Sequence, residues 1–231
     1  MHRHTQGHDP ASTMATEEML AVFDRQGQPL GLKPRSAVHR DGDWHMLTFV
    51  WAARRLGDGR AAFLLQIRGR PTDRFRGHVD APAGGHVPGA ESHLEGAVRE
   101  AAEEMGLALG PEELTYLGRR QIESLPMDCK RTFQHHYLCR RPLTLEDVHV
   151  TEEVTGFVEV DLADFSALID KKAEKARASM LTKDGGGIRP GVVTAENLAL
   201  YSAEVRQTFR LVIRASLHVL ETGGVDPGVF G

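Results

Sequence analysis

The chain has 231 residues, of which 41% are hydrophobic, and a formal net charge of -4, which suits one soluble domain with extensions. This charge excludes the basic surface of a nucleic-acid-binding protein, and no apolar run is long enough to span a membrane. The start lacks the apolar segment of a signal peptide, and the only cysteines are Cys129 and Cys139, so we expect a cytoplasmic protein with ordinary thiols.

The first part of the chain is predicted to be a tail followed by strands. Residues 1–18 are expected to form a disordered tail, and residues 19–23 a short apolar strand. Longer strand patterns cover 44–53 and 61–68, and the Gly-Asp-Gly sequence at 57–59 between them is typical of a hairpin turn.

The next segment has the pattern of an amphipathic helix. Ser92 followed by Glu95 forms an S-x-x-E capping box, and Gly106 suits the left-handed residue that ends a helix. Apolar residues recur at helical spacing at Leu94, Ala97, Val98, Ala101, Ala102 and Met105. This helix is therefore expected to bury one face and to turn the other toward a cleft or solvent.

Three carboxylates lie on that second face. Glu100, Glu103 and Glu104 are spaced i, i+3, i+4, which brings their side chains together. A divalent cation would offset their repulsion, and hard oxygen ligands suit Mg²⁺ or Mn²⁺. Because Mg²⁺ in proteins usually also contacts substrate phosphates, the pattern indicates phosphate chemistry. Taken alone, such a charge run is more often a solvated surface.

The remaining elements complete the domain. Strands are expected over 113–122, 132–139 and 154–160, followed by a short helix over 162–169. We therefore place the domain at 19–169.

Residues 170–231 are predicted to be a helical extension packed on this domain. A charged helix is expected over 170–181 and a long helix over 195–220, with a glycine-rich loop between them. The long helix would either cap the domain or form a homodimer contact.

The spacing around the acidic helix matches a family signature. Gly85, Glu91, Arg99, the three glutamates, Gly106 and Leu107 fill every fixed position of the Nudix box, G-x5-E-x7-R-E-U-x-E-E-x-G-U, where U is a bulky apolar residue. The one partial mismatch is Ala101, which is smaller than the bulky apolar residue that the pattern has at this U position. The chain resembles the Nudix hydrolases, which implies an α/β fold, an α/β/α sandwich around a mixed sheet, and water attack on a diphosphate linkage.

The resemblance also implies a role for each box residue. Glu103, Glu104 and the carbonyl of Gly85 correspond to metal ligands, and Glu100 to a further ligand or the base that orients water. Arg99 corresponds to the residue that holds the acids in place. The implied cofactor is Mg²⁺, with Mn²⁺ as the alternative, and the implied partner is a small-molecule diphosphate.

Residues outside the box are candidates for substrate contacts. Arg68 and Arg70 precede the box and are candidates to grip phosphate oxygens, with a solvated surface as the alternative. Phe133 and Gln134 lie on a predicted strand and are candidates to line the substrate pocket, although the core is the default place for Phe133.

Two acids beyond the box are candidates for an additional ligand or base. Glu152 and Glu153 precede a predicted strand, and hydrolases that resemble this chain often use a downstream acid. The alternative, given equal weight, is that the two acids form salt bridges on the surface and have no catalytic role.

The flanks of the box resemble the branch of the family related to isopentenyl-diphosphate isomerase, over residues 19–168. The isomerase has a catalytic cysteine just before the loop histidine, where this chain has Gly84-Gly85, and two glutamates near the positions of Thr132 and Gln134. Its metal site also contains histidines, for which His39, His45 and His86 are candidates, with ordinary hydrogen bonding as the default for His39 and His45.

The favoured hypothesis is a Mg²⁺-dependent Nudix hydrolase, because the box is complete and the isomerase thiol is missing. The alternatives are an isomerase-like protein and a non-catalytic Nudix domain that binds a ligand. The diphosphate substrate stays open, since the box contacts only the group that all candidate substrates share.

Overall fold

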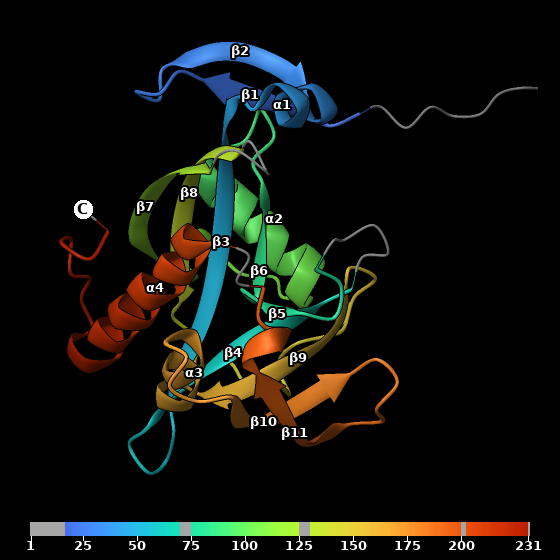
Figure 1. The fold of residues 1–231 in the computed structure, drawn as a ribbon, viewed down its shortest axis with the longest axis vertical. Helices are drawn as coiled ribbons and strands as arrows, with labels where there is room; N and C mark the ends of the chain where they lie inside the picture. Colours follow the sequence, from blue (N-terminus) through green and yellow to red (C-terminus); the bar gives the residue numbers. More distant parts are fainter. Residues whose placement is uncertain (1–16, 70–74, 125–129, 200–201, 231) are drawn as a thin grey trace, which may run out of the picture.

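The computed structural model describes residues 17–69, 75–124, 130–199 and 202–230. In these ranges an 11-stranded mixed sheet carries α2 (His93–Met105) on one face and α3 (Leu162–Ile169) and α4 (Ala203–Thr222) on the other (Figure 1). This arrangement confirms the expected α/β/α sandwich.

The central strand is β3 (Trp44–Arg55), which joins the two halves of the sheet. It pairs in parallel with β8 (Lys130–Cys139) and antiparallel with β6 (Ala83–His86), and its end pairs antiparallel with β4 (Ala61–Arg68). Helices cover both faces here, which explains why β3 is rich in aromatic and branched side chains along most of its length.

The other strands extend the sheet on either side of β3. β7 (Leu114–Ser124) pairs with β8, while β5 (Val79–Asp80) and β9 (Val154–Asp161) pair with β4. β10 (Lys175–Thr182) and β11 (Ile188–Thr194) continue the sheet beyond β9. β1 (Met19–Phe23) and β2 (Pro29–Pro34) form a hairpin at the opposite end.

Helix α2 begins and ends as predicted. The Ser92 side chain accepts a hydrogen bond from the Glu95 N–H, and the Glu95 carboxylate accepts one from the Ser92 N–H. Gly106 ends the helix in the left-handed region, with φ of 68°. Ala101 and Met105 are fully buried against the sheet. Glu100 and Glu104 are buried beside them and only Glu103 is exposed, so the expectation that all three acids lie opposite the buried face is wrong.

An aromatic core fixes the helices on the other face. The rings of Phe63 and Phe165 lie 6.0 Å apart between centroids, and those of Phe165 and Phe209 lie 5.7 Å apart. Trp51 of β3 meets Phe209 edge to face at 5.3 Å. These contacts dock α4 over β3 and β4.

The segment after α3 differs from the prediction. Residues 175–182 form β10, so the expected charged helix over 170–181 is wrong. Ala176, Ala178 and Met180 pack against the core at every second position, which is the period of a strand. The lysines and the glutamate at 171–175 favour a helix, but hydrogen bonding of β10 to β9 outweighs this local preference. The extension therefore starts as part of the sheet.

The remaining helices are short. They are α1 (Arg35–Asp41), which was not predicted, and the single-turn helices η1 (Pro111–Glu113) and η2 (Ala195–Asn197). None of the helices in the described ranges is long and apolar enough to cross a membrane.

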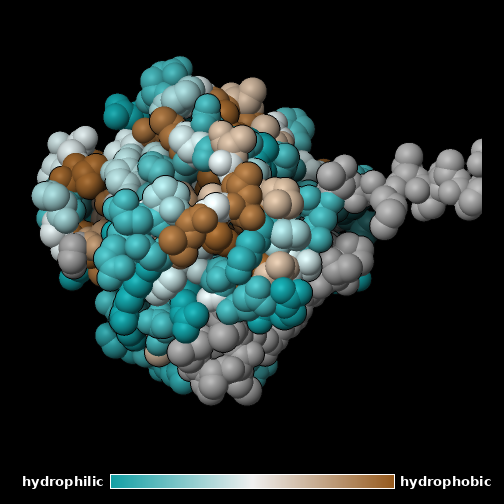
Figure 2. Space-filling model, turned by 90° about the horizontal axis from the view of Figure 1, so that it is seen from above, coloured by the Kyte–Doolittle hydropathy of each residue, from teal (hydrophilic) through white to brown (hydrophobic). Residues whose placement is uncertain are grey.

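Exposed apolar side chains gather on the β1–β2 hairpin, at Met19, Leu30 and Leu32. Figure 2, which views the molecule from above, shows apolar residues among polar ones on this face. Cys139 is a buried free thiol, whereas Cys129 and most of the predicted tail lie outside the described residues. The homodimer contact expected of the C-terminal helix stays a prediction.

Candidate active site

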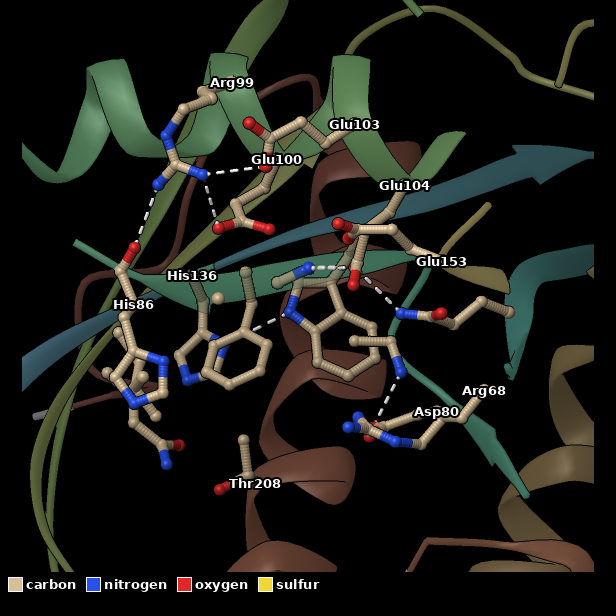
Figure 3. A pocket seen from close by; sticks show the side chains of 18 of the residues that line it. Arg68, Asp80, His86, Arg99, Glu100, Glu103, Glu104, His136, Glu153 and Thr208 are labelled. Atoms are coloured by element: carbon tan, nitrogen blue, oxygen red, sulfur yellow. Dashed lines mark hydrogen bonds and ion pairs between the residues drawn. The ribbon is translucent and has the colours of Figure 1, made fainter. Parts of the chain in front are cut away.

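A cavity of about 790 Å³ opens beside the acidic face of α2 (Figure 3). Its charged and polar lining includes Glu18, Arg35, Gln66, Arg68, Asp80, Glu91, Arg99, Glu100, Glu103, Glu104 and Glu153. The structure thus brings the acids of the box together in a cavity of the size that holds small molecules.

Arg99 holds the carboxylates of the box in place. Its Nε donates to the two oxygens of Glu91 at 3.0 and 3.1 Å, and its Nη1 donates to Glu100 at 2.8 Å and to Glu103 at 2.9 Å. Its Nη2 donates to the carbonyl of His86 at 2.9 Å, which ties the helix to the end of β6. Burial opposes the charge, but the carboxylates of Glu100 and Glu91 outweigh it and raise the pKa of Arg99.

Two glycines let carboxylates approach the backbone of β6. A Cβ on Gly85 would fall on the Glu100 carboxylate. The N–H of Gly84 and the amide of Gln66 each donate to one oxygen of Glu104 at 2.9 Å. Glu100 and Glu104 are only 4% and 7% exposed. Buried acids need compensating charge, and this cluster of hard oxygens, with Arg99 beside it, fits a divalent cation.

The two acids beyond the box have different surroundings. Glu153 lines the cavity (Figure 3). The Glu152 side chain is 96% exposed and pairs with Lys183 at 3.6 Å. On the cationic side, Arg68 lines the cavity and its Nη1 donates to Asp80 at 2.7 Å.

The predicted substrate contacts on β8 separate into two groups. Gln134 lines the cavity. Phe133 points to the other face of the strand, is fully buried, and stacks on Trp44 at 4.9 Å between ring centroids. Its assignment to the substrate pocket is therefore wrong, and the default core position holds. Arg70 lies outside the described residues.

His39, His45 and His86 lie close together, and His86 also lines the cavity. Their ligand nitrogens lie within 4.8 Å of one another, and the Nε2 atoms of His39 and His86 are 3.0 Å apart. The Nδ1 of His45 lies 2.9 Å from the carbonyl of Asp43, which assigns the proton to Nδ1 and makes Nε2 the acceptor nitrogen. Three imidazoles in this arrangement match the donor set of a Zn²⁺-type metal.

Several residues of the cavity were missed in the sequence. Thr208 and Phe209 reach it from α4, far along the chain, and Trp51 has the pattern of a core residue. His136 also lines it, and the strand alternation that selected Gln134 would have selected His136 as well. No sequence signal could have placed α4 here, because its position depends on tertiary packing.

Comparison with known proteins gives a consistent picture. A sequence profile of the NUDIX domain matches residues 46–183. An uncharacterized Nudix hydrolase of Clostridium acetobutylicum is 30% identical over 161 residues, which cover 68% of this chain and 77% of that protein. One of Rhodococcus erythropolis is 38% identical over 120 residues, 48% of this chain and 62% of that protein. The fold resembles the crystal structure of DR0079 from Deinococcus radiodurans, with a TM-score of 0.50 and 20% identity, over 67% of this chain and 90% of that one.

Proposed function

The chain belongs to the Nudix family, and we propose that it is a Mg²⁺-dependent hydrolase that cleaves the diphosphate linkage of a nucleoside diphosphate derivative or a related organic diphosphate. The observation that carries this proposal is Arg99, which gathers Glu91, Glu100 and Glu103 on the wall of a cavity. A non-catalytic domain that only binds a ligand would not need all of these acids, so the complete set favours an enzyme.

The residues that would hold the metal are Glu100, Glu103, Glu104 and the carbonyl of Gly85. Bound Mg²⁺ neutralises charge on a diphosphate and lowers the pKa of bound water, and Mn²⁺ accepts the same oxygen ligands. The chain itself supplies the preorganisation, because Arg99 already orients two of these carboxylates.

Glu153 and Glu100 are our candidates for the base that takes a proton from the attacking water. Both line the cavity, and a base must come within hydrogen-bond reach of the water. We assign no catalytic role to Glu152, because it is exposed and paired with Lys183. Arg68 is the candidate cation for phosphate oxygens, since its planar guanidinium suits phosphate geometry and Asp80 orients it.

The isomerase alternative has less support in this chain. A Cβ on Gly84 would fall on the ring of Phe49, so the space that a cysteine needs is already filled. Thr132 and Gln134 are neutral where the isomerase has acids. The one observation in favour of isomerase-like chemistry is the histidine cluster, which fits a borderline metal better than Mg²⁺.

The proposal is tested with purified protein and a panel of nucleoside diphosphates, nucleotide sugars, dinucleotides and thiamine diphosphate. We expect phosphate release or linkage cleavage with Mg²⁺ or Mn²⁺ and none with EDTA. Glu103→Gln should lower kcat by about 10²–10⁴-fold, with an intact fold because the Glu103 side chain is 44% exposed.

Absence of metal-dependent hydrolysis across the whole panel would rule out the enzyme proposed here. Interconversion of isopentenyl and dimethylallyl diphosphate by the same preparation would favour the isomerase instead.

A further inference from the structure

A second cavity, of about 480 Å³, lies apart from the candidate active site. It is lined from the ends of β3 and β8, the start of β7 and the C-terminal end of α4. Among the described residues, its lining shares no member with the lining of the first cavity. Cavities of this volume hold small molecules, so the second cavity has room for a ligand of its own.

The walls of the second cavity are largely apolar. Ala53 of β3 and Leu138 of β8 are 5% and 2% exposed and belong to the core beneath α4. Val219 and Leu220 of α4 are partly buried and pack against the same core. A ligand with an apolar body is stabilised here, because contact with these side chains removes apolar surface from water.

Two guanidinium groups stand beside these apolar walls. Arg55 ends β3 and Arg140 directly follows β8, and both are exposed residues that line the cavity. Arg54 lines it as well, but its guanidinium donates to both carboxylate oxygens of Glu159, at 2.7 and 2.8 Å. The cations that can meet a ligand are therefore Arg55 and Arg140.

The charges of these two arginines are only partly compensated. Arg55 donates to the carbonyl of Gly59 at 3.0 Å and lies 3.8 Å from the carboxylate of Glu221, whose side chain is 60% exposed. Such an exposed pair is weak. Arg140 has no ion pair within the described part of the chain, and no acidic side chain of that part lines the cavity. The second cavity is therefore positively charged.

The C-terminal end of α4 does not cancel this charge. A helix end carries about half an elementary charge, from carbonyls that lack a donor. Here the N–H of Gly223 donates to the Val219 carbonyl at 2.8 Å, and the hydroxyl of Thr222 donates to the His218 carbonyl at 2.9 Å. The remaining partial charge is smaller than the two full charges of the arginines, so an anion is favoured over a cation.

We propose that the second cavity binds a small amphipathic anion, with its apolar body against Leu138 and Leu220 and its oxyanion on Arg55 and Arg140. A carboxylate, a sulfonate and a phosphate share the geometry that the guanidinium fork recognises. The site is independent of the proposed function, because no residue that would hold the metal or the diphosphate takes part in it.

The test uses two dyes that differ by one charge. Anilinonaphthalenesulfonate and N-phenylnaphthylamine both fluoresce in apolar surroundings, and the second lacks only the sulfonate. Titration of the full chain in EDTA gives a Kd for each dye. We expect Arg140→Gln to weaken binding of the sulfonate by about tenfold, as for loss of one hydrogen bond to a charged group, and to leave the neutral dye unchanged.

Two control variants locate the bound dye. Arg141→Gln removes the same charge from the next residue, which does not line the cavity, and Arg68→Gln removes a cation from the first cavity. Both should bind the sulfonate as the wild type does. Arg140→Gln should stay folded, because the side chain is exposed and the backbone N–H still donates to the Glu113 carbonyl.

Competition then tests the chemical class of the ligand. Octanoate and octanamide have the same alkyl chain, so octanoate should displace the sulfonate dye at concentrations about tenfold lower. Equal displacement by both, or an equal Kd for the sulfonate dye in wild type and Arg140→Gln, would overturn the inference. So would the same loss in Arg141→Gln, which indicates surface charge alone, or a loss in Arg68→Gln instead, which places the dye in the first cavity.

Discussion

The Glu100 carboxylate occupies the space that a side chain on Gly85 would need. Gly85→Ala should therefore push this carboxylate out of the position set by Arg99. Because displacement of a catalytic group by about 1 Å can cost about 10²-fold in rate, we expect kcat/KM to fall by one to two orders of magnitude while the protein stays folded. Steady-state hydrolysis of the best substrate from the panel measures this effect.

The matched control for this change is Gly57→Ala. Gly57 has no atom near its Cβ position and does not have a positive φ, so its activity should equal that of the wild type. Full activity in Gly85→Ala would show that the position of Glu100 against the backbone does not matter for the reaction.

His135 and His136 are expected to make stability depend on pH. Burial, the main cause, lowers the pKa of each to about 3 from an ordinary 6.5. Below pH 6.5 the unfolded chain binds protons that the folded chain excludes, so the free energy of unfolding falls as the pH falls toward 3 and is fully present above 6.5. The limiting slope is about 1.4 kcal/mol per pH unit for each group.

Urea unfolding between about pH 7.5 and 5.5 tests this dependence. His135→Gln should be less stable at neutral pH but should show a flatter pH dependence, because one excluded proton is removed. His149→Gln, at an exposed position, should keep the slope of the wild type. An unchanged slope in His135→Gln would contradict the assignment.

The sequence predicts the positions of some site residues better than those of others. Arg99 and Glu103 are spaced i, i+4 on one helix, so the ion pair between them follows from the pattern alone. Gln134 and Phe133 are neighbours on one strand, and only the packing of β8 decides which of them meets the cavity. Thr208 depends on the docking of another helix, which no local pattern encodes.

At the scale of elements, the capping box of α2 is expected to contribute directly to stability. Ser92→Ala removes the hydroxyl that accepts the Glu95 N–H and should lower the free energy of unfolding by about 1 kcal/mol, measured by urea denaturation. Ser166→Ala, inside α3, is the control, because alanine has the higher helix propensity there. A loss in Ser166→Ala as large as that in Ser92→Ala would mean that the cap has no special role.

Helix α2 could be predicted because its start, apolar stripe and end are all local signals. β10 could not, because the lysines and the glutamate of residues 171–175 favour a helix, while the alternate positions Ala176, Ala178 and Met180 suit a strand. Pairing with β9 on one side and β11 on the other decides the outcome. The sequence alone does not show which strands pair with one another, so the partners of β10 could not be known in advance.

At the scale of the whole molecule, the resemblance to the Nudix family predicted the α/β/α sandwich. It did not predict that α4 forms one wall of the cavity. The family domain ends at residue 183, yet Phe209 and Val212 of α4 belong to the same apolar core as Phe63 and Phe165. The extension is therefore part of the fold, and the same helix that completes the core supplies the wall opposite the acids.

Metal binding should be coupled to the stability of the whole fold, because the carboxylate cluster exists only in the folded chain. A ligand that binds only the folded state at 100 times its Kd adds about 2.7 kcal/mol, which corresponds to about 5–11 °C in Tm for a chain of this size. We expect thermal unfolding to shift upward by this order when saturating Mg²⁺ replaces EDTA.

The location of the metal is tested by three variants in the same measurement. Glu104→Gln should lose most of the Mg²⁺ shift, since it removes one of the buried charges that the cation offsets. Glu152→Gln should keep the shift because its side chain is exposed and outside the cavity. His45→Asn should also keep it, because imidazoles prefer softer metals than Mg²⁺. A shift lost in His45→Asn and retained in Glu104→Gln would move the Mg²⁺ site from α2 to the histidine cluster.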